Sequence, residues 1–323
     1  MVDVILADGN LKPAGVSVSA GLDWAAGSSE NDFELTLEPT APTPADGWYF
    51  WLDGTDVGGR ITDRRSTVTG ASSMITWLGV SWHGLLAGKI LKPDRGQDYL
   101  VVSGTMSSIL ANLIKRVGLD TVFTVRAGPQ DPSLSNHRFE NPRYVDAYTG
   151  ITGMLKSHGL RLDFKAMDDM IILSAQPITR VTNTVDSDLV DFKAQTNHRV
   201  TNHLIGLGQG ELKDRLVSEW YADRNGNVSQ TQSLTGVDEV VEIYDASNAD
   251  ADELAKNTRK RLEEYQTGGS VDITVGDGPA DTLMLGDQVT ASDRNTGLQV
   301  TSTVIKRVVK ISEGVLSIDH ELG

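Results

Sequence analysis

Short stretches in which apolar and polar residues alternate fill the first 95 positions of the chain and predict β-strands. Positions 33–37 show the two-residue period of a half-buried strand, and positions 48–52 are dense in aromatic side chains. Asp53 and Gly54 follow directly and favour a turn. Many short strands joined by tight turns are typical of a β-barrel or a sandwich, and a polar linker at 92–97 ends this block. Further strands are expected at 2–6, 16–19, 57–64, 74–80 and 85–91.

The hydrophobic period changes after the linker, where apolar residues recur every three or four positions and predict helices. One helix is expected at 106–117, with Thr105 or Ser103 as its N-cap. A second is expected at 146–157, with Asp146 as its N-cap. Residues 96–178 therefore predict an α/β module. Its strands are expected at 122–126, 160–165 and 170–175, the last two forming a hairpin.

Strand patterns return after position 178 and surround one more helix. Ser247 and Asp250 resemble a capping box, and the helix that follows has an apolar face that includes Leu254 and Leu262. A tight hairpin turn is expected at 295–297. Strands are expected at 189–192, 203–207, 215–222, 237–244, 271–275, 288–291, 298–309 and 315–319.

Composition places this chain among soluble globular proteins of two or three domains. It has 323 residues, 39% of them hydrophobic and 23% charged. The absence of cysteine excludes disulfide bonds and zinc sites made of thiolates. We expect no secretory signal peptide, because the first ten residues lack a basic start followed by a long apolar run. We also expect no membrane span, because no stretch approaches the roughly 20 apolar residues that one needs.

The net charge of −15 argues against specific binding to DNA, since an acidic surface repels the phosphate backbone. The simplest interpretation is that the charge keeps the protein soluble. A second interpretation is that the negative charge forms a surface along which DNA can move without binding.

Motifs that carry chemistry are weak throughout the chain. Gly206, Gly208 and Gly210 do not have the spacing of a nucleotide-binding loop, and we expect a twisted strand end there. Ser81 and His83 offer a conceivable nucleophile and base, but the glycine spacing departs from a nucleophile elbow. We expect them on a strand that is followed by another strand. No catalytic or cofactor-binding residues are predicted, and no cofactor.

Metal sites and paired acids also have ordinary interpretations. His198 and His203 would lie on opposite faces of one strand, so we predict no shared metal. The oxygen-rich segments 223–227 and 293–295 faintly resemble calcium loops, but we interpret them as turns. Adjacent acids are expected on a hairpin tip or on helix ends, which does not suit a glycosidase cleft. These acids are Asp168 and Asp169, then Asp250, Asp252 and Glu253, then Glu263 and Glu264.

The aromatic cluster at Trp48, Tyr49 and Trp51 is the candidate site for an interface or a glycan. Aromatic rings can stack on sugars, although such a cluster on a strand more often belongs to a core or an interface.

The order of these blocks resembles the hub proteins at the tail tip of siphophages, such as the N-terminal module of tail-associated lysins. More remotely, it resembles the baseplate hubs of contractile tails and type VI secretion spikes. The segments that carry the resemblance span nearly the whole chain. They are 31–37 (NDFELTL), 51–61, 76–90 (TWLGVSWHGLLAGKI), 99–110, 143–155, 202–208 (NHLIGLG) and 283–289 (LMLGDQV).

The resemblance implies an α+β, mainly β protein with two tail-tube-like β-barrels and inserted α/β modules, assembled as a ring-forming homotrimer. By this analogy the first barrel is 1–95, the α/β module is 96–178, and 213–267 is an inserted strand–helix module. The second barrel is discontinuous, 179–212 with 268–323. Rings of this kind cover strand edges that are otherwise open to aggregation.

The implied role is structural, at the distal end of the phage tail. The hub would join the sixfold tail tube to the threefold tip and form the channel for genome ejection. Its partners would be further copies of itself, distal tail or tube proteins, tip or receptor-binding proteins, and DNA that passes without specific binding. Tail-associated lysins continue into a lytic domain that this sequence lacks, so no enzyme is expected. Two alternatives stay open: a carbohydrate- or receptor-binding tip protein, and a glycan-hydrolysing tail enzyme.

Overall fold

The computed structural model describes residues 2–69, 72–140, 142–167, 169–183, 190–194, 201–266, 271–275, 283–292 and 299–323. The chain forms two compact units. The larger unit comprises Met1–Asp191 with Ile273–Gly323, and the smaller comprises Phe192–Asp272. The chain passes between them at β16 (Val190–Ala194) and β21 (Val271–Val275).

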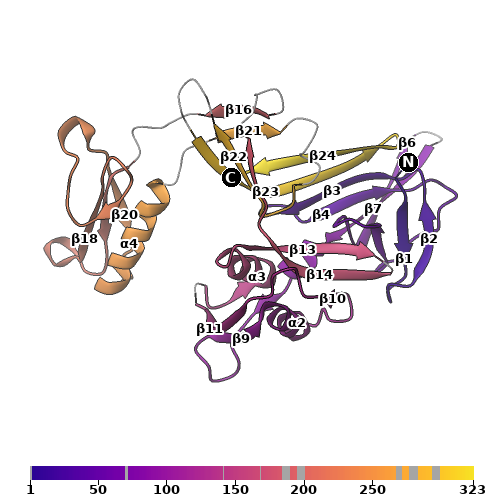
Figure 1. Cartoon of the computed structure of the whole chain (residues 1–323), viewed down its shortest axis with the longest axis horizontal. Coiled ribbons are helices and arrows are strands. Elements are labelled where there is room, and N and C mark those ends of the chain that lie inside the picture. Colours follow the sequence, from indigo (N-terminus) through magenta and orange to yellow (C-terminus); the bar gives the residue numbers. More distant parts are fainter. Residues whose placement is uncertain are drawn as a thin grey trace. The chain divides into compact units, whose positions relative to one another are not determined.

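The larger unit is built on an 11-stranded sheet that joins the two ends of the chain (Figure 1). Strand β3 pairs antiparallel with β23, so that Trp24 lies opposite Val309. Among the described residues the strand order does not close on itself, and no closed barrel forms there. The order is β15 (Arg180–Asn183), β22 (Gln288–Ser292), β23 (Gln299–Ser312), β3 (Gly21–Gly27), β4 (Asp32–Thr36), β7 (Ser72–Ser81), β6 (Gly58–Thr69), β5 (Tyr49–Leu52), β1 (Val4–Ala7) and β2 (Pro13–Ser17), with β24 (Val315–Leu322) also paired to β23.

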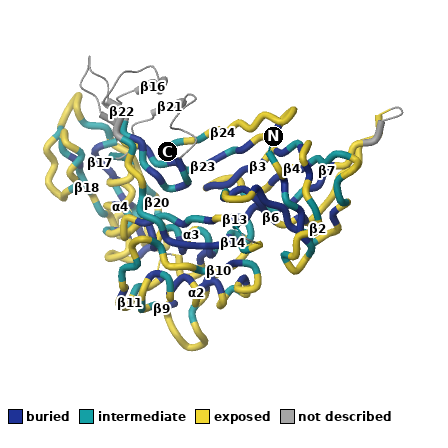
Figure 2. The backbone as a smooth tube through the Cα atoms, turned by 45° about the vertical axis from the view of Figure 1, so that its right-hand side comes forward, coloured by how far each residue is buried: buried dark blue, intermediate teal, exposed yellow. Residues whose placement is uncertain are grey.

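One face of this sheet is an apolar core, as the alternation of side chains on strands requires. Trp24, Phe33 and Leu35 are almost fully buried there. The strands expected near the N-terminus are present, with ends shifted by a few residues. The chain is thus mainly β, as predicted. Figure 2 shows buried stretches along β3 and β23.

The strand expected at 85–91 is wrong, because a helix occupies its first three positions and only its last two are strand. Helix α1 (Trp82–Ala87) begins directly after β7, and the Ser81 hydroxyl accepts a hydrogen bond from the Gly84 N–H as its N-cap. Trp82 and Leu86 are four positions apart and both are buried, which is helical spacing. Only β8 (Ile90–Leu91) remains as strand, paired with β12 (Val145–Asp146).

The α/β part of the larger unit agrees with its predicted helices and hairpin. Helix α2 (Met106–Arg116) is capped by Thr105, and α3 (Ala147–Lys156) is capped by Asp146. Strands β13 (Leu160–Met167) and β14 (Met170–Pro177) pair as a hairpin. Strand β10 (Phe123–Val125) joins β14 in parallel, and the pair β9 (Leu100–Thr105) and β11 (Ser133–Phe139) was not predicted.

The smaller unit is a four-stranded sheet covered by one helix. The strand order is β19 (Val228–Ser229), β18 (Val217–Ala222), β17 (His203–Leu207) and β20 (Val241–Asp245). Leu254 and Leu262 of helix α4 (Ala251–Gln266) are buried. The capping box expected at Ser247 is wrong, because the Asp250 carboxylate accepts the Glu253 N–H at 2.9 Å. Two short 3₁₀ turns lie at Leu212–Asp214 and Gly236–Asp238.

Candidate functional site

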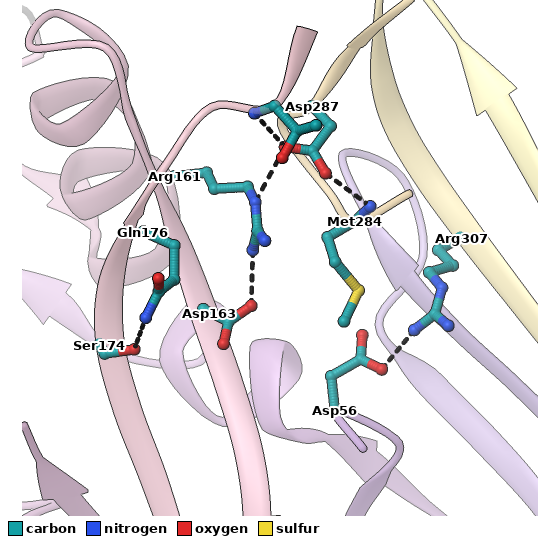
Figure 3. Close-up of polar contacts among 9 residues, drawn as sticks. Asp56, Arg161, Asp163, Ser174, Gln176, Met284, Asp287 and Arg307 are labelled. Atoms are coloured by element: carbon teal, nitrogen blue, oxygen red, sulfur yellow. Dashed lines mark hydrogen bonds and ion pairs between the residues drawn. The ribbon is translucent and has the colours of Figure 1, made fainter. Parts of the chain in front are cut away.

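A group of buried charges ties the sheet of the larger unit to its α/β part (Figure 3). Arg307 on β23 forms an ion pair with Asp56, which follows β5, and their side chains are 5% and 7% exposed. Charges removed from water are stable only when they are paired and hydrogen-bonded. This ion pair therefore fixes the β5–β6 connection against the C-terminal strands.

Asp287 is the most deeply buried acid of the group, and three donors satisfy it. Its carboxylate accepts the Thr179 N–H at 2.8 Å and the Met284 N–H at 2.9 Å. It also accepts the Arg161 Nε–H at 2.9 Å, a contact between residues 126 positions apart. The connection before β22 is thus anchored to β13.

Arg161 bridges two acids, since its Nη1 also lies 2.5 Å from Asp163 Oδ1. Burial raises the pKa of Asp163, and the Arg161 guanidinium opposes this change. Asp56, Asp163 and Asp287 face two arginines, so the group carries one formal negative charge when all three acids are ionised. This arrangement holds strands together, and its acids are occupied by partners rather than free to act on a substrate.

A cavity of about 500 Å³ lies beside this group, between α3, β13 and the loop before β22. His83 lines it and is 3% exposed, with its ring 4.6 Å from the centroid of Phe164. Burial lowers the pKa of His83 to about 4, so the ring is neutral at pH 7. Burial likewise raises the pKa of Tyr148, another lining residue, to about 12.

Ser81 lies on a strand as expected, as the last residue of β7, whereas His83 belongs to helix α1 rather than to a strand. Ser81 is fully buried, and its hydroxyl accepts the Gly84 N–H at 3.3 Å. The Nδ1 atom of His83 has no hydrogen-bond partner among the described residues. The geometry therefore matches a helix cap beside a core histidine.

The aromatic candidates Trp48, Tyr49 and Trp51 have different surroundings. Tyr49 and Trp51 are 5% and 1% exposed and belong to one hydrophobic core, whereas Trp48 is half-buried and packs against a second core. The Tyr49 ring stacks on Trp82, with centroids 6.1 Å apart. Of these three side chains, only Trp48 is exposed enough to contact a glycan. A glycan role at this cluster stays a prediction.

The glycines of the smaller unit allow close packing of a helix. A Cβ added to Gly206 would lie 2.0 Å from Thr258 Oγ1 of α4, and one added to Gly208 would meet Leu254 at 2.9 Å. Gly210 adopts a φ of 100°. The segment in which we expected a twisted strand end is thus the end of β17, and helix α4 packs closely against it.

The predicted metal candidates have local partners. His203 Nδ1 lies 2.7 Å from Glu239 Oε1, and His198 is outside the described residues. The Asp223 carboxylate accepts the N–H groups of Asn225 and Asn227, which confirms the predicted turn, and hydrogen bonds from Asn227 lower its pKa. Residues 293–295 are outside the described residues. The described part of the chain holds no group of three or more potential metal ligands.

The adjacent acids lie at turns and helix ends. Asp169 has a φ of 59° in the β13–β14 turn, and Asp168 is outside the described residues. Asp252 and Glu253 lie in the first turn of α4, where the helix dipole favours acids. Glu263 pairs with Arg259 on the exposed surface of the same helix. Within the described residues, no helix has the length and apolar character needed to cross a membrane.

The buried ion pairs were not predicted from the sequence. Asp56 and Arg307 are 251 positions apart, and nothing local to either residue indicates its partner. The one available signal was Arg307 itself, a charged residue among the apolar positions of a predicted strand.

The open sheet and its α/β attachment make up the fold of phage tail proteins, as comparison with solved structures shows. No protein-family model matches the chain, and neither does any curated protein. A 43 kDa tail protein of prophage MuSo2 from Shewanella oneidensis has a TM-score of 0.56 at 13% identity, over 99% of this chain and 98% of that protein.

Two further structures show the same likeness. The tail protein from Neisseria meningitidis MC58 has a TM-score of 0.51 at 17% identity, over 100% of this chain and 97% of its own. A chain of the p2 virion baseplate in its activated conformation has a TM-score of 0.50 at 10% identity, covering 100% and 98%. The predicted resemblance to phage tail proteins is therefore confirmed for the fold.

Proposed function

We propose that this chain is a structural hub protein of a phage tail baseplate and carries out no enzymatic turnover. The observation that supports this most strongly is the extent of the structural likeness. It covers 99% of this chain and 98% of a phage tail protein, so it concerns the whole architecture rather than one shared module. The buried ion pairs of the larger unit, whose acids all have partners, support a rigid structural role.

We take the working form to be a homotrimer that joins the sixfold tail tube to a threefold tip at the distal end of the tail. The strands of 1–95 and of 179–212 with 268–323, for which two tail-tube-like barrels were expected, would then contribute to one ring. Open strand edges support assembly: among the described residues β2 pairs only with β1, and β24 only with β23. Exposed edges of this kind bind other strands unless they are covered.

The ring would surround the channel through which the genome leaves. A subunit charge of −15 supports a lumen to which DNA does not adhere, because like charges repel at short range in solution. Neighbouring tail and tip proteins would then bind the outer rims of the ring.

Antibody labelling of intact phage tests this proposal. Antibodies raised against the chain should label the distal end of the tail in electron micrographs. Label along the whole tail tube, on the capsid, or only on proteins released from lysed cells would contradict the proposed position. A zymogram of the purified chain on peptidoglycan should show no clearing, and a cleared zone would contradict the absence of turnover.

A further inference from the structure

The hairpin of β6 and β7 extends beyond the sheet that it belongs to. The pairing of β7 with β4 ends at Thr76, which lies opposite Thr36. Beyond that point, Ser66–Thr69 of β6 and Ser72–Ile75 of β7 pair only with each other among the described residues. We call these two segments the arm. Figure 2 shows β7 running out past the sheet, with exposed residues along it.

One face of the arm continues the apolar core of the subunit. Paired residues of an antiparallel hairpin share a face, and faces alternate along each strand. Trp77, Ile75 and Val68, which pairs with Ser73, therefore lie on the same side. Their exposure rises outward, from 6% at Trp77 to 40% at Ile75 and 70% at Val68. The face of the sheet that is buried in the core thus becomes exposed to solvent along the arm.

The opposite face of the arm is different in character. Arg65, at the base of the arm, lies on this side and forms an ion pair of 2.6 Å with Glu34 of the neighbouring strand, whereas Arg64 lies opposite Trp77 on the first face. Met74 lies there as well, 56% exposed and opposite Thr67. Only the inner face is continuous with buried aromatic and aliphatic residues, so it is the face that a partner would cover.

A two-stranded ribbon that packs on nothing is marginally stable in water. Among the described residues the strands of the arm pair with no further strand, and Val68 is 70% exposed. We propose that the inner face of the arm, with Val68 and Ile75, docks onto a second copy of this chain and holds neighbouring subunits of the ring together. This inference rests on the proposed function.

Charge favours a second copy as the occupant. The arm itself carries no charged residue, but β6 leads into it with Arg60, Arg64 and Arg65 against one acid, Asp63. The base of the arm therefore has a net of two positive formal charges, in a chain of net charge −15. Opposite potentials favour association and select the partner.

A second copy also offers a suitable strand edge. Strand β24 has one edge that is unpaired among the described residues. Val315 and Leu316 on it are 68% and 38% exposed, and Asp319 and Glu321 are exposed acids on the same strand. Every subunit therefore carries an arm and an acidic, partly apolar edge. Contacts between two different surfaces of identical chains generate a closed ring when the rotation closes.

The test compares two variants of the full chain by light scattering over a range of protein concentrations. The double variant Val68→Asp, Ile75→Asp places charges on the inner face, and Met74→Asp places one on the outer face as the matched control. We expect a trimer for the unchanged chain and for Met74→Asp. The double variant should dissociate at a concentration on the order of tenfold higher or more, because a charge replaces an apolar contact.

Three other results would overturn the inference. Trimers of equal stability in all three proteins would mean that the arm binds a different tail protein, and would leave the proposed function intact. Equal weakening by both variants would show that the inner face has no special role. A monomer for the unchanged chain, at every concentration and in intact virions, would contradict the proposed function itself. Circular dichroism of each variant confirms that the subunit is folded.

Discussion

Asp56 and Arg307 show how single residues hold distant parts of this chain together. They lie 251 positions apart in the sequence, and each is almost fully buried. A buried pair contributes little net stability compared with apolar residues, but removal of one partner leaves an uncompensated charge. The pair therefore acts as a constraint on which strands meet, more than as a source of stability.

Replacement of Arg307 by methionine should lower the free energy of unfolding by about 3–5 kcal/mol, because Asp56 is then buried without a partner. Arg65→Met should cost less than about 1 kcal/mol, since the Arg65–Glu34 pair is half exposed. Urea unfolding followed by tryptophan fluorescence measures both, because five of the six tryptophans lie in the larger unit.

The double variant Arg307→Met, Asp56→Leu separates the charge from the packing. It should recover part of the stability that Arg307→Met loses, because neither charge remains. Equal losses in the single and double variants would show that packing around Arg307, rather than the orphaned carboxylate, sets the cost.

His83 makes stability depend on pH in a defined window. Its pKa is about 4 in the folded protein and about 6.5 in the unfolded chain. Between these values only the unfolded chain binds the proton, so the contribution is complete above pH 6.5 and is lost as the pH falls toward 4. From pH 7 to pH 4.5 the loss should be about 2–3 kcal/mol.

Comparison of the unchanged protein with His83→Gln isolates this contribution from that of the carboxylates. Urea unfolding at pH 7 and at pH 4.5 should show that the variant loses less stability than the unchanged protein, by about 2–3 kcal/mol. Parallel losses in the two proteins would mean that His83 is protonated in the folded state at pH 4.5.

Elements whose signals lie within a few residues are the ones that the sequence predicts well. Thr105 and Asp146 cap their helices as expected, because an N-cap bonds to a backbone N–H only three positions away. Helix α1 was missed, since its six residues are too few to show a period against the strands around it. The pairing of β3 with β23 could not be predicted, because it depends on residues some 280 positions apart.

The same contrast between local signals and long-range contacts applies to the candidate site. The sequence singled out Ser81, His83 and the aromatic cluster, but the ionic group of Asp56, Arg161, Asp287 and Arg307 forms only after distant strands have come together. The local sequence shows which side chains could carry chemistry, whereas the burial of each side chain and its partners depend on the tertiary structure.

Helix α3 offers a matched pair of glycines that tests its packing. A Cβ on Gly150 would lie 2.8 Å from Val145 Cγ1, whereas a Cβ on Gly153 would meet nothing within 4 Å. Gly150→Ala should therefore destabilise the larger unit by about 1–3 kcal/mol through overpacking. Gly153→Ala should stabilise it by about 0.5–1 kcal/mol, since alanine favours the helix. Thermal unfolding in which both variants shift in the same direction would contradict this packing of α3.

On the scale of the whole molecule, the charge of −15 predicts how the protein behaves with DNA. Double-stranded DNA should show no retardation with the purified chain in a gel-shift assay at moderate salt, because phosphate and protein repel each other. Micromolar binding that weakens as salt rises would show a basic surface that dominates the net charge, and would argue against a non-adhesive channel.

The open edges of β2 and β24, the arm and the fold shared with phage tail proteins support the proposal that this chain forms a ring of three at the tail's distal end. Electron cryo-microscopy of intact tails tests it most directly. We expect three copies around a threefold axis at the distal end, with the arm of each copy packed against the neighbouring copy. Single separated copies there, or copies repeated along the tube, would contradict it.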